Sequence, residues 1–323
     1  MPNNFINWGV ISCAGIADIA VLPGIKSANN AKLHAVSSRS MAKAIEFKEK
    51  FGAVKAYDSY EAVLDDPEVE AVYIPLPNSM HLEWVLKAAA KKKHILCEKP
   101  LGCTAQEVLD MQAACEKNGV LLMEAFAYRQ SPVTKKVKEL VDNGAVGTIK
   151  MIEAHFYYPV SDLKNVRLQK DLLGGAVYDV GCYNLNVMRY IAGEEPTSIY
   201  ASGEIGKESG VDENSTTVMN FRNNVRGVSH CGFNVAFRSE YQVIGDAATL
   251  QVPDMFNAKG DLRILIRKNG ITEVLKVDTP DNYMLEVEQF GRCILNNEKP
   301  LLSLEDSYKN AQVIDEILKQ LNY

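Results

Sequence analysis

An aspartate and a tyrosine in this sequence have the types and the spacing that acid–base chemistry requires. Asp179 and Tyr183 stand four residues apart at the start of a predicted helix, so both side chains project from one face, one turn apart. A phenol has an ordinary pKa of about 10, too high for a base near neutral pH, and a neighbouring ammonium favours its ionised form. Spacing alone leaves two interpretations open: an acid–base pair, or a helix-capping aspartate beside a core tyrosine.

Lys99 is the candidate for that ammonium. It stands between Glu98 and Pro100, directly after a short apolar run, and residues at the carboxyl ends of parallel strands lie where ligands bind. A lone lysine in a loop is more often a solvated charge. Held between a carboxylate and a ring-constrained proline, it can instead polarise a ligand oxygen and lower the pKa of a neighbouring group.

The first apolar run of the chain leads into a loop of small residues. A dinucleotide-binding fold carries G-x-G-x-x-G/A at this place, and here Ser12 and Ala14 occupy the first two glycine positions. Small side chains still let the backbone approach a pyrophosphate, and the next helix offers free N–H groups. A packing turn is the alternative, but the position after the first strand favours nucleotide contacts by Ser12, Ala14, Gly15 and Ile16.

The end of the second apolar run predicts which nucleotide is bound. No carboxylate stands there to accept hydrogen bonds from a ribose 2′-hydroxyl. Arg39 beside the hydroxyls of Ser37 and Ser38 suits a 2′-phosphate instead. The sequence therefore predicts NADP, with NAD as the alternative if Arg39 is a solvated charge at a helix start.

The elements that must position these residues alternate between apolar runs and amphipathic segments up to about residue 125. Such alternation predicts parallel strands joined by helices, an open doubly wound α/β sheet of the Rossmann type. The expected strands are 6–11, 32–36, 71–74, 94–97 and 120–123, and the expected helices are 42–51, 81–90 and 105–117.

After residue 127 the pattern changes to strands of alternating polarity with a few helices. It predicts an α+β domain whose mainly antiparallel sheet is covered by helices on one side, with a hairpin at Asn269 and Gly270. We expect a dinucleotide-binding domain over 1–125 and a substrate-binding and oligomerisation domain over 126–323. The sequence does not say on which domain the last two helices, 284–295 and 304–321, pack, and they can pack back on the first.

Composition excludes several classes of protein. The 41 acidic and 35 basic side chains leave a net charge of −6, which provides no broad basic surface for a nucleic acid. No segment approaches the roughly 18 apolar residues that a membrane span requires. The seven cysteines form no C-x-x-C pair, which indicates reduced thiols, no metal site and a cytoplasmic protein.

Five segments, in order along nearly the whole chain, resemble the Gfo/Idh/MocA family of NAD(P)-dependent oxidoreductases. They are residues 8–11, 74–81, 98–100, 124–129 and 174–183. Tyr183 and the Ser-x-Ala turn are most similar to the D-xylose dehydrogenase and dimeric dihydrodiol dehydrogenase branch. The inositol dehydrogenase branch carries histidine at the position of Tyr183, which argues against inositol as substrate.

The resemblance implies hydride transfer between NADP(H) and a CH–OH or C=O group of a sugar, polyol or vicinal diol. Tyr183 would be the general acid/base assisted by Lys99, Asp179 would orient Lys99 or a substrate hydroxyl, and Arg167 would reach a sugar hydroxyl. Taken alone, Arg167 is a solvated charge, His81 a helix N-terminal residue and Arg129 a bridge between domains. The further cofactor contacts that the resemblance implies are Leu76, Pro77, Asn78, His81, Glu98, Lys99 and Arg129.

Two other functions stay open. One is a redox-neutral NAD(P)-dependent enzyme, similar to a glycoside hydrolase, that oxidises a sugar only transiently. The other is a non-catalytic NADPH-binding regulator, against which the presence of both Lys99 and Tyr183 argues, since a sensor needs neither. The resemblance also implies a homodimer or homotetramer formed through the open face of the C-terminal sheet.

Overall fold

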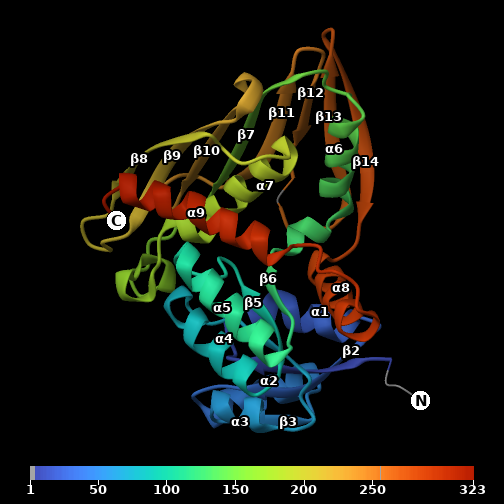
Figure 1. The fold of residues 1–323 in the computed structure, drawn as a ribbon, viewed down its shortest axis with the longest axis vertical. Coiled ribbons are helices and arrows are strands. Elements are labelled where there is room, and N and C mark those ends of the chain that lie inside the picture. The colour runs from blue at the N-terminus through green and yellow to red at the C-terminus, as the bar shows by residue number, and fades with distance from the viewer. Residues whose placement is uncertain (1–3, 255) are drawn as a thin grey trace. The chain divides into compact units, whose positions relative to one another are not determined.

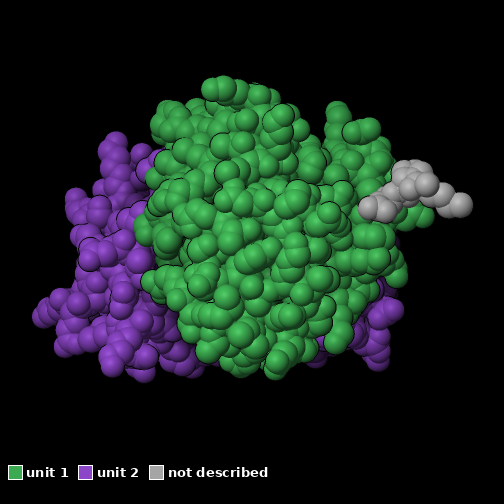
Figure 2. Space-filling view, turned by 90° about the horizontal axis from the view of Figure 1, so that it is seen from below, with its two compact units in different colours: residues 1–102, 106–130, 281–308 green, residues 103–105, 131–280, 309–323 purple. Residues whose placement is uncertain are grey.

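The computed structural model describes residues 4–254 and 256–323, which divide into two compact units (Figures 1 and 2). Unit 1 comprises the residues up to 102 together with 106–130 and 281–308. Unit 2 comprises 103–105, 131–280 and 309–323. Within the described ranges, no helix is long and apolar enough to cross a membrane.

Unit 1 is built on a six-stranded sheet in which every pair of neighbours is parallel. The strand order is β3-β2-β1-β4-β5-β6. This is the doubly wound order, in which successive strands are added on one side of β1 up to β3 and on its other side from β4 onward. The predicted Rossmann sheet is therefore confirmed. The strands are β1 Ile6–Ile11, β2 Ala31–Ser37, β3 Lys55–Tyr57, β4 Ala71–Ile74, β5 His94–Glu98 and β6 Leu122–Ala125.

Helices join these strands and bury the apolar residues of the sheet. The crossover and closing helices are η1 Ala17–Val21, α1 Leu22–Ser27, α2 Met41–Phe51, α3 Tyr60–Asp65, η2 Asn78–Met80, α4 His81–Ala90, α5 Ala105–Asn118, η3 Ala127–Gln130 and α8 Asn282–Asn296. Trp8 of β1 is fully buried against Phe290 of α8, with ring centroids 5.7 Å apart. Gly24 lets α1 and α8 approach, because a Cβ there would meet the backbone of Tyr283 at 2.9 Å. The first of the two closing helices thus packs in unit 1.

Unit 2 is built on an eight-stranded sheet of order β14-β13-β12-β11-β7-β10-β9-β8. Among the strand pairs of the described residues in this sheet, only β7 and β10 run parallel, so the prediction of a mainly antiparallel sheet is confirmed. Asn269 and Gly270 have positive φ angles of 51° and 77° in the turn between β13 and β14, as the hairpin requires. The strands are β7 Ile149–Tyr157, β8 Ser198–Ile205, β9 Asp212–Asn220, β10 Arg226–Gly232, β11 Arg238–Gly245, β12 Thr249–Val252, β13 Gly260–Lys268 and β14 Ile271–Thr279.

Helices cover one face of this sheet, where Figure 1 shows α6, α7 and α9. Ile152 and Ala154 of β7 point to that face and are fully buried, whereas Glu153 and His155 point to the other face and are partly exposed. The helices of unit 2 are α6 Pro132–Asp142, η4 Val166–Leu168, η5 Lys170–Leu172, η6 Val177–Gly181, α7 Cys182–Ala192, η7 Arg222–Asn224 and α9 Leu304–Gln320, whose first turn lies in unit 1.

Candidate active site

The residues predicted to bind a nucleotide gather at the edge of the unit 1 sheet where its strands end, here called the carboxyl edge. Each group follows a different strand of the parallel sheet, and ligands bind at this edge in doubly wound folds. Residues 12–16 follow β1, Ser37 ends β2 and residues 38–39 follow it, residues 76–78 follow β4, Glu98 ends β5 and Lys99 follows it, and Arg129 follows β6.

The loop of residues 12–16, here called the nucleotide loop, forms the turn of a glycine-rich loop, although Ser12 and Ala14 stand at the first two glycine positions. Ser12 has φ of 97°, a conformation that L side chains rarely adopt. Gly15 is exposed, and a Cβ built on it meets no atom of the described residues within 4 Å. Cys13 is buried and donates to Ser37 O at 3.4 Å, and burial raises the pKa of its thiol to about 11. The open backbone at Gly15 and the turn at Ser12 fit a bound pyrophosphate.

The three residues at the end of β2 that are predicted to contact the ribose or its 2′-phosphate differ in burial and in hydrogen bonding. Ser37 is fully buried and its Oγ donates to Val10 O at 3.1 Å. Ser38 Oγ accepts from Ser40 N at 3.3 Å, and Arg39 is exposed. Ser37 therefore fixes β2 to β1, and Ser38 and Arg39 are the side chains near the start of α2 that fit a 2′-phosphate.

His81 holds two loops of the carboxyl edge together. Its ring has no exposed surface, with Nε2 2.9 Å from Leu76 O and Nδ1 2.9 Å from Pro100 O. Burial lowers its pKa below the ordinary value for histidine. The histidine thereby connects the loop after β4 with the loop that carries Lys99.

Carboxylates anchor the loop that carries the half-buried Lys99. Glu98 Oε1 accepts from Tyr73 Oη at 2.6 Å, and Glu98 Oε2 accepts from Lys99 N at 3.2 Å. Glu124 Oε1 accepts from Leu101 N at 2.9 Å. Glu286 of α8 is buried near Glu98 and Glu124, and burial and their charges raise its pKa well above the ordinary value.

Arg129 is a buried cation in unit 1. Its side chain is 8% exposed, and its Nη1 donates to Asp306 Oδ2 at 2.8 Å. Asp306 lies in the first turn of α9. Both residues belong to unit 1. The ion pair therefore fixes the segment that follows β6.

In unit 2, Asp179 is the acceptor of a small polar cluster. Its Oδ2 accepts from Tyr158 Oη at 2.5 Å and from Arg167 Nε at 2.8 Å. The nearby carboxylate raises the pKa of the Arg167 guanidinium, so this residue stays charged. Arg167 is thus not a fully solvated charge: it is paired with Asp179, and its side chain is 38% exposed.

Tyr183 is packed among aromatic rings and is hydrogen-bonded at its phenol oxygen. Its ring is 5.5 Å from that of Phe156 and 5.4 Å from that of Phe256, between centroids. Asn257 Nδ2 donates to Tyr183 Oη at 3.3 Å. Phe156 and Tyr158 are two residues apart and share one side of β7 and its extension, so Asp179 and Tyr183 project from one side of their helix, as the spacing predicts.

The helix that carries both residues, η6 followed by α7, begins at a tight backbone crossing. A Cβ on Gly174 would meet Arg167 O at 2.4 Å, and one on Gly175, where φ is 116°, would meet Asp212 Oδ1 at 2.1 Å. Asp212 Oδ2 accepts from Val177 N at 2.7 Å and so caps the helix. Burial raises the pKa of the Asp212 carboxyl to about 7.

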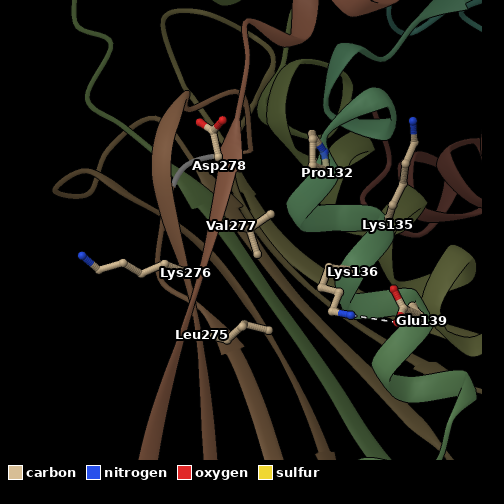
Figure 3. Close-up of a pocket in the computed structure, with 8 residues that line it drawn as sticks. All are labelled: Pro132, Lys135, Lys136, Glu139, Leu275, Lys276, Val277 and Asp278. Carbon is tan, nitrogen blue, oxygen red and sulfur yellow. Dashed lines mark hydrogen bonds and ion pairs between the residues drawn. The ribbon is translucent and has the colours of Figure 1, made fainter.

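A separate groove of about 550 Å³ lies between α6 and β14 (Figure 3). Lys136 and Glu139, which line it, form an ion pair of 2.8 Å on the exposed side of α6. None of the residues that line it is among those predicted to do chemistry: Pro132, Lys135, Lys136, Glu139, Leu275, Lys276, Val277 and Asp278.

Four polar residues near the predicted ones are not predicted from the sequence. Tyr158 extends the alternation of the strand, and this pattern predicts that it shares a side with Phe156. Asp212 and Asn257 lie far along the chain from their hydrogen-bond partners, and Glu286 lies far along the chain from Glu98 and Glu124, whose charges act on it. No local pattern announces a partner that another strand or helix supplies.

Two family models match the chain. The oxidoreductase family with an NAD-binding Rossmann fold matches residues 6–126, and the GFO/IDH/MocA C-terminal domain matches residues 134–251. The chain is 34% identical to D-xylose 1-dehydrogenase (NADP(+)) 2 of Haloferax volcanii, over 96% of this chain and 95% of that protein. It is 31% identical to trans-1,2-dihydrobenzene-1,2-diol dehydrogenase of Danio rerio, over 98% and 97%.

Among solved structures, a 3-ketoreductase from Actinomadura kijaniata in complex with NADP and TDP-benzene is similar, with a TM-score of 0.94, 27% identity and 98% of each chain covered. Variants of that reductase with a tyrosine replaced by phenylalanine or a lysine by alanine were also solved with both ligands. The similarity extends over both units and confirms the resemblance carried by the motifs. This chain therefore belongs to the Gfo/Idh/MocA family and is an oxidoreductase with an NAD-binding Rossmann fold.

Proposed function

We propose that this protein transfers a hydride between NADP(H) and a CH–OH or C=O group of a sugar, polyol or vicinal diol. The observation that carries the proposal is the setting of Tyr183: its ring is packed among aromatic side chains, yet its oxygen meets an amide donor. A tyrosine with only a packing role needs no such cluster of polar groups. Asp179, on the same side of the helix that carries Tyr183, and its partner Arg167 of η4 add to this support.

In the proposed mechanism, Tyr183 moves the proton. In the direction of oxidation its phenolate takes the proton of the substrate hydroxyl, while the carbon loses a hydride and becomes a carbonyl. When bound, NADP supplies the acceptor for that hydride at C4 of its nicotinamide. The proton then leaves Tyr183 for solvent, and in reduction the same phenol donates it to the carbonyl oxygen.

Lys99 favours the phenolate in this proposal, because a nearby cation stabilises the ionised form of an acid. Glu98 and Glu124 hold the backbone of the Lys99 loop. Asp179 holds the guanidinium of Arg167 by its Nε, which leaves Arg167 to donate to a substrate hydroxyl.

The proposed cofactor is NADP, with NAD as the alternative. Support comes from Ser38 and the exposed Arg39 at the end of β2, and from the NADP named in the relatives. The nucleotide loop would take the pyrophosphate, with His81, Glu98 and Arg129 fixing the surrounding backbone. The proposed contacts are Ser12, Ala14, Gly15, Ile16, Ser38, Arg39, Leu76, Pro77, Asn78 and Lys99.

The test is NADPH absorbance when the purified protein is given NADP and a panel of aldoses, polyols and trans-diols. NAD and the Tyr183→Phe variant are run beside it. We expect NADP reduction with at least one member of the panel and its loss in the variant. Cofactor that co-purifies, with substrate cleaved and no net NADPH formed, would instead show a redox-neutral enzyme. NADPH binding with no turnover of any kind would indicate a regulator.

We further propose that copies of the chain associate through the uncovered face of the unit 2 sheet, as a homodimer or homotetramer. That face carries part-exposed aromatic and imidazole groups, among them Tyr157 and His230 with ring centroids 5.1 Å apart. The helices α6, α7 and α9 cover the opposite face (Figure 1). Light scattering measures the mass in solution, and a monomer would refute this proposal.

The proposed compartment is the cytoplasm. All seven cysteines are buried, and burial raises the thiol pKa of Cys13 to about 11 and of Cys115 to about 12. Thiols that stay protonated and enclosed are slow to react, which suits a reducing compartment. Localisation of a tagged chain in its own cells tests this.

A further inference from the structure

The amide of Asn257 meets the oxygen on which the proposed acid–base step depends. Asn257 lies in the loop between β12 and β13, and its Nδ2 donates to Tyr183 Oη at 3.3 Å. The preceding residue, Phe256, stacks on Tyr241 of β11 with centroids 5.7 Å apart and an interplanar angle of 21°. It also packs against the Tyr183 ring. The loop is thereby held to the sheet in a position that presents the amide to the phenol.

The other end of the same amide is an unsatisfied acceptor. Asn257 Oδ1 is buried and has no hydrogen-bond partner among the residues that the structure describes. A buried acceptor without a partner is destabilising, and such atoms in native structures call for an explanation. A ligand that supplies the missing hydrogen explains this one, since the atom belongs to the group that binds Tyr183 Oη.

We propose that Asn257 is a positioning residue that holds the Tyr183 oxygen with its amide N–H and accepts, with its carbonyl, the hydroxyl next to the reacting carbon. This inference rests on the proposed function and names its substrate more closely. The donor and acceptor of an amide are separated by one carbon, so the two groups that it binds must lie close together. In a vicinal diol, one hydroxyl gives its proton to Tyr183 and its neighbour donates to Asn257.

The two halves of the Asn257 amide are here called the donor arm, Nδ2–H, and the acceptor arm, Oδ1. The donor arm favours the ionised form of Tyr183. An N–H that points at a phenol oxygen stabilises the phenolate more than the neutral phenol, because hydrogen bonds to ionised groups are stronger. A change at residue 257 leaves in place the charged groups on the helix of Tyr183 and on the loop of Asn257. These include Asp179 with its partners Arg167 and Tyr158, and Asp254 with its partner Arg263.

The donor arm is tested without turnover, by ultraviolet difference titration of each protein against its Tyr183→Phe derivative. Asn257→Ala removes both arms, and Asn257→Asp keeps the size and the acceptor but replaces the donor with a charge. We expect the pKa of Tyr183 to rise by about one to two units in Asn257→Ala and further in Asn257→Asp. The exposed Asn143, which caps the C-terminal end of α6, provides Asn143→Ala as a control with an unchanged titration.

The acceptor arm is tested with an aldose and its 2-deoxy analogue, oxidised at C1. In the unchanged protein, kcat/KM should be about tenfold or more lower for the deoxy sugar than for the aldose. Asn257→Asp keeps the acceptor and should show the same difference between the two sugars. In Asn257→Ala the two sugars should differ little.

Three results would contradict, in turn, the donor arm, the acceptor arm and the proposed function. Identical titrations of the unchanged protein, Asn257→Ala and Asn257→Asp, with melting curves that show each folded, would overturn the donor arm. A preference for the 2-hydroxyl that survives in Asn257→Ala would overturn the acceptor arm. If no substrate in the panel is oxidised, the proposed function fails, and the titration still decides whether Asn257 tunes the Tyr183 phenol.

Discussion

The nucleotide loop of unit 1 and the entry to the Tyr183 helix of unit 2 are both small-residue turns, but they are built in opposite ways. Each leads into a π-helical turn, η1 and η6. At Gly15 an added Cβ meets no described atom within 4 Å, whereas at Gly175 it would meet Asp212 Oδ1 at 2.1 Å. One turn leaves open space beside its backbone, and the other is filled by the protein's own groups.

Because only one of the two turns is open, substitutions in them should change different properties of the protein. Open backbone at a helix start is available to a ligand, so changes at the nucleotide loop should act on cofactor affinity with little effect on folding. A turn closed by a buried carboxylate determines how its helix is held. Changes at the Gly175 turn should therefore act first on stability.

The largest effects are expected where each unit supplies a chemical group. Lys99→Ala and Tyr183→Phe should each lower kcat about 10²–10⁴-fold, the range of general acid–base groups. Both should still bind NADPH, because the nucleotide loop and the other proposed contacts stay in place when Lys99 or Tyr183 is replaced. Fluorescence titration of NADPH and steady-state kinetics measure the two quantities. Near-normal turnover in either variant would end the assignment of that residue.

The two glycines provide the direct test of the contrast. Gly175→Ala adds strain at a positive φ and a clash with Asp212, and should cost on the order of 4 kcal/mol of stability. Gly15→Ala should leave unfolding unchanged and weaken NADPH binding about tenfold or more, because its methyl group fills the space proposed for the pyrophosphate. Denaturant unfolding and NADPH titration of both variants measure these effects. Equal loss of stability in the two would show that the turns do not differ as described.

The closed turn also predicts a pH dependence. The Asp212 carboxyl has a pKa of about 7 in the folded chain, against an ordinary value of 3.8, so between these values the folded state holds a proton that the unfolded state releases. The contribution of this group to stability is therefore greatest below about pH 4, and it falls by about 4 kcal/mol as the pH rises to about 7.

Asp212→Asn is the matched variant for that dependence. Its amide oxygen can still accept from Val177 N, but it does not titrate, so the part of the slope due to residue 212 should vanish. Unfolding free energies measured from pH 4 to pH 8 for both proteins give the comparison. A slope that is the same in Asp212→Asn would assign the dependence to other groups.

At the carboxyl edge of the unit 1 sheet, Arg39 should determine the preference for NADP over NAD without affecting folding. Loss of a charged hydrogen bond to a 2′-phosphate costs about 1.5–3 kcal/mol, so Arg39→Ala should reduce the preference for NADP over NAD roughly 10- to 100-fold. Lys32→Ala removes another exposed cation in unit 1, on β2, and is the control. An unchanged ratio of the two kcat/KM values in Arg39→Ala would refute the assignment of NADP to this residue.

The same contrast explains what the sequence predicts and what it does not. Strand ends of a parallel sheet can be located from apolar runs, so the amino-acid sequence alone predicts residues 12–16, Arg39 and Lys99 at one edge. The three-residue β3 and the six-residue α3 are too short to show a period and are not predicted. The strand expected at 120–123 begins instead at Leu122, because Val120 N donates to Cys115 O and completes the end of α5.

The Tyr183 site depends on partners that sequence does not announce. Helical spacing predicts that Asp179 and Tyr183 share a side, and the Gly174–Gly175 pair predicts a close approach of backbone. Asn257 and Asp212 reach these residues from other strands and loops of unit 2, and a side chain's partner across a sheet has no local signature.

The smallest effect is expected at Ser12, where the open turn is strained. A serine at φ 97° destabilises the folded chain by about 1–3 kcal/mol relative to glycine in the same conformation. Glycine in turn destabilises it by about 0.5–1 kcal/mol, because it makes the unfolded chain more flexible. Ser12→Gly should therefore stabilise the protein by about 1 kcal/mol and leave NADPH affinity within about twofold. Thermal unfolding with and without NADPH measures both. A loss of affinity without a gain in stability would mean that the Ser12 hydroxyl contacts the cofactor, and that the nucleotide loop binds through a side chain as well as through its backbone.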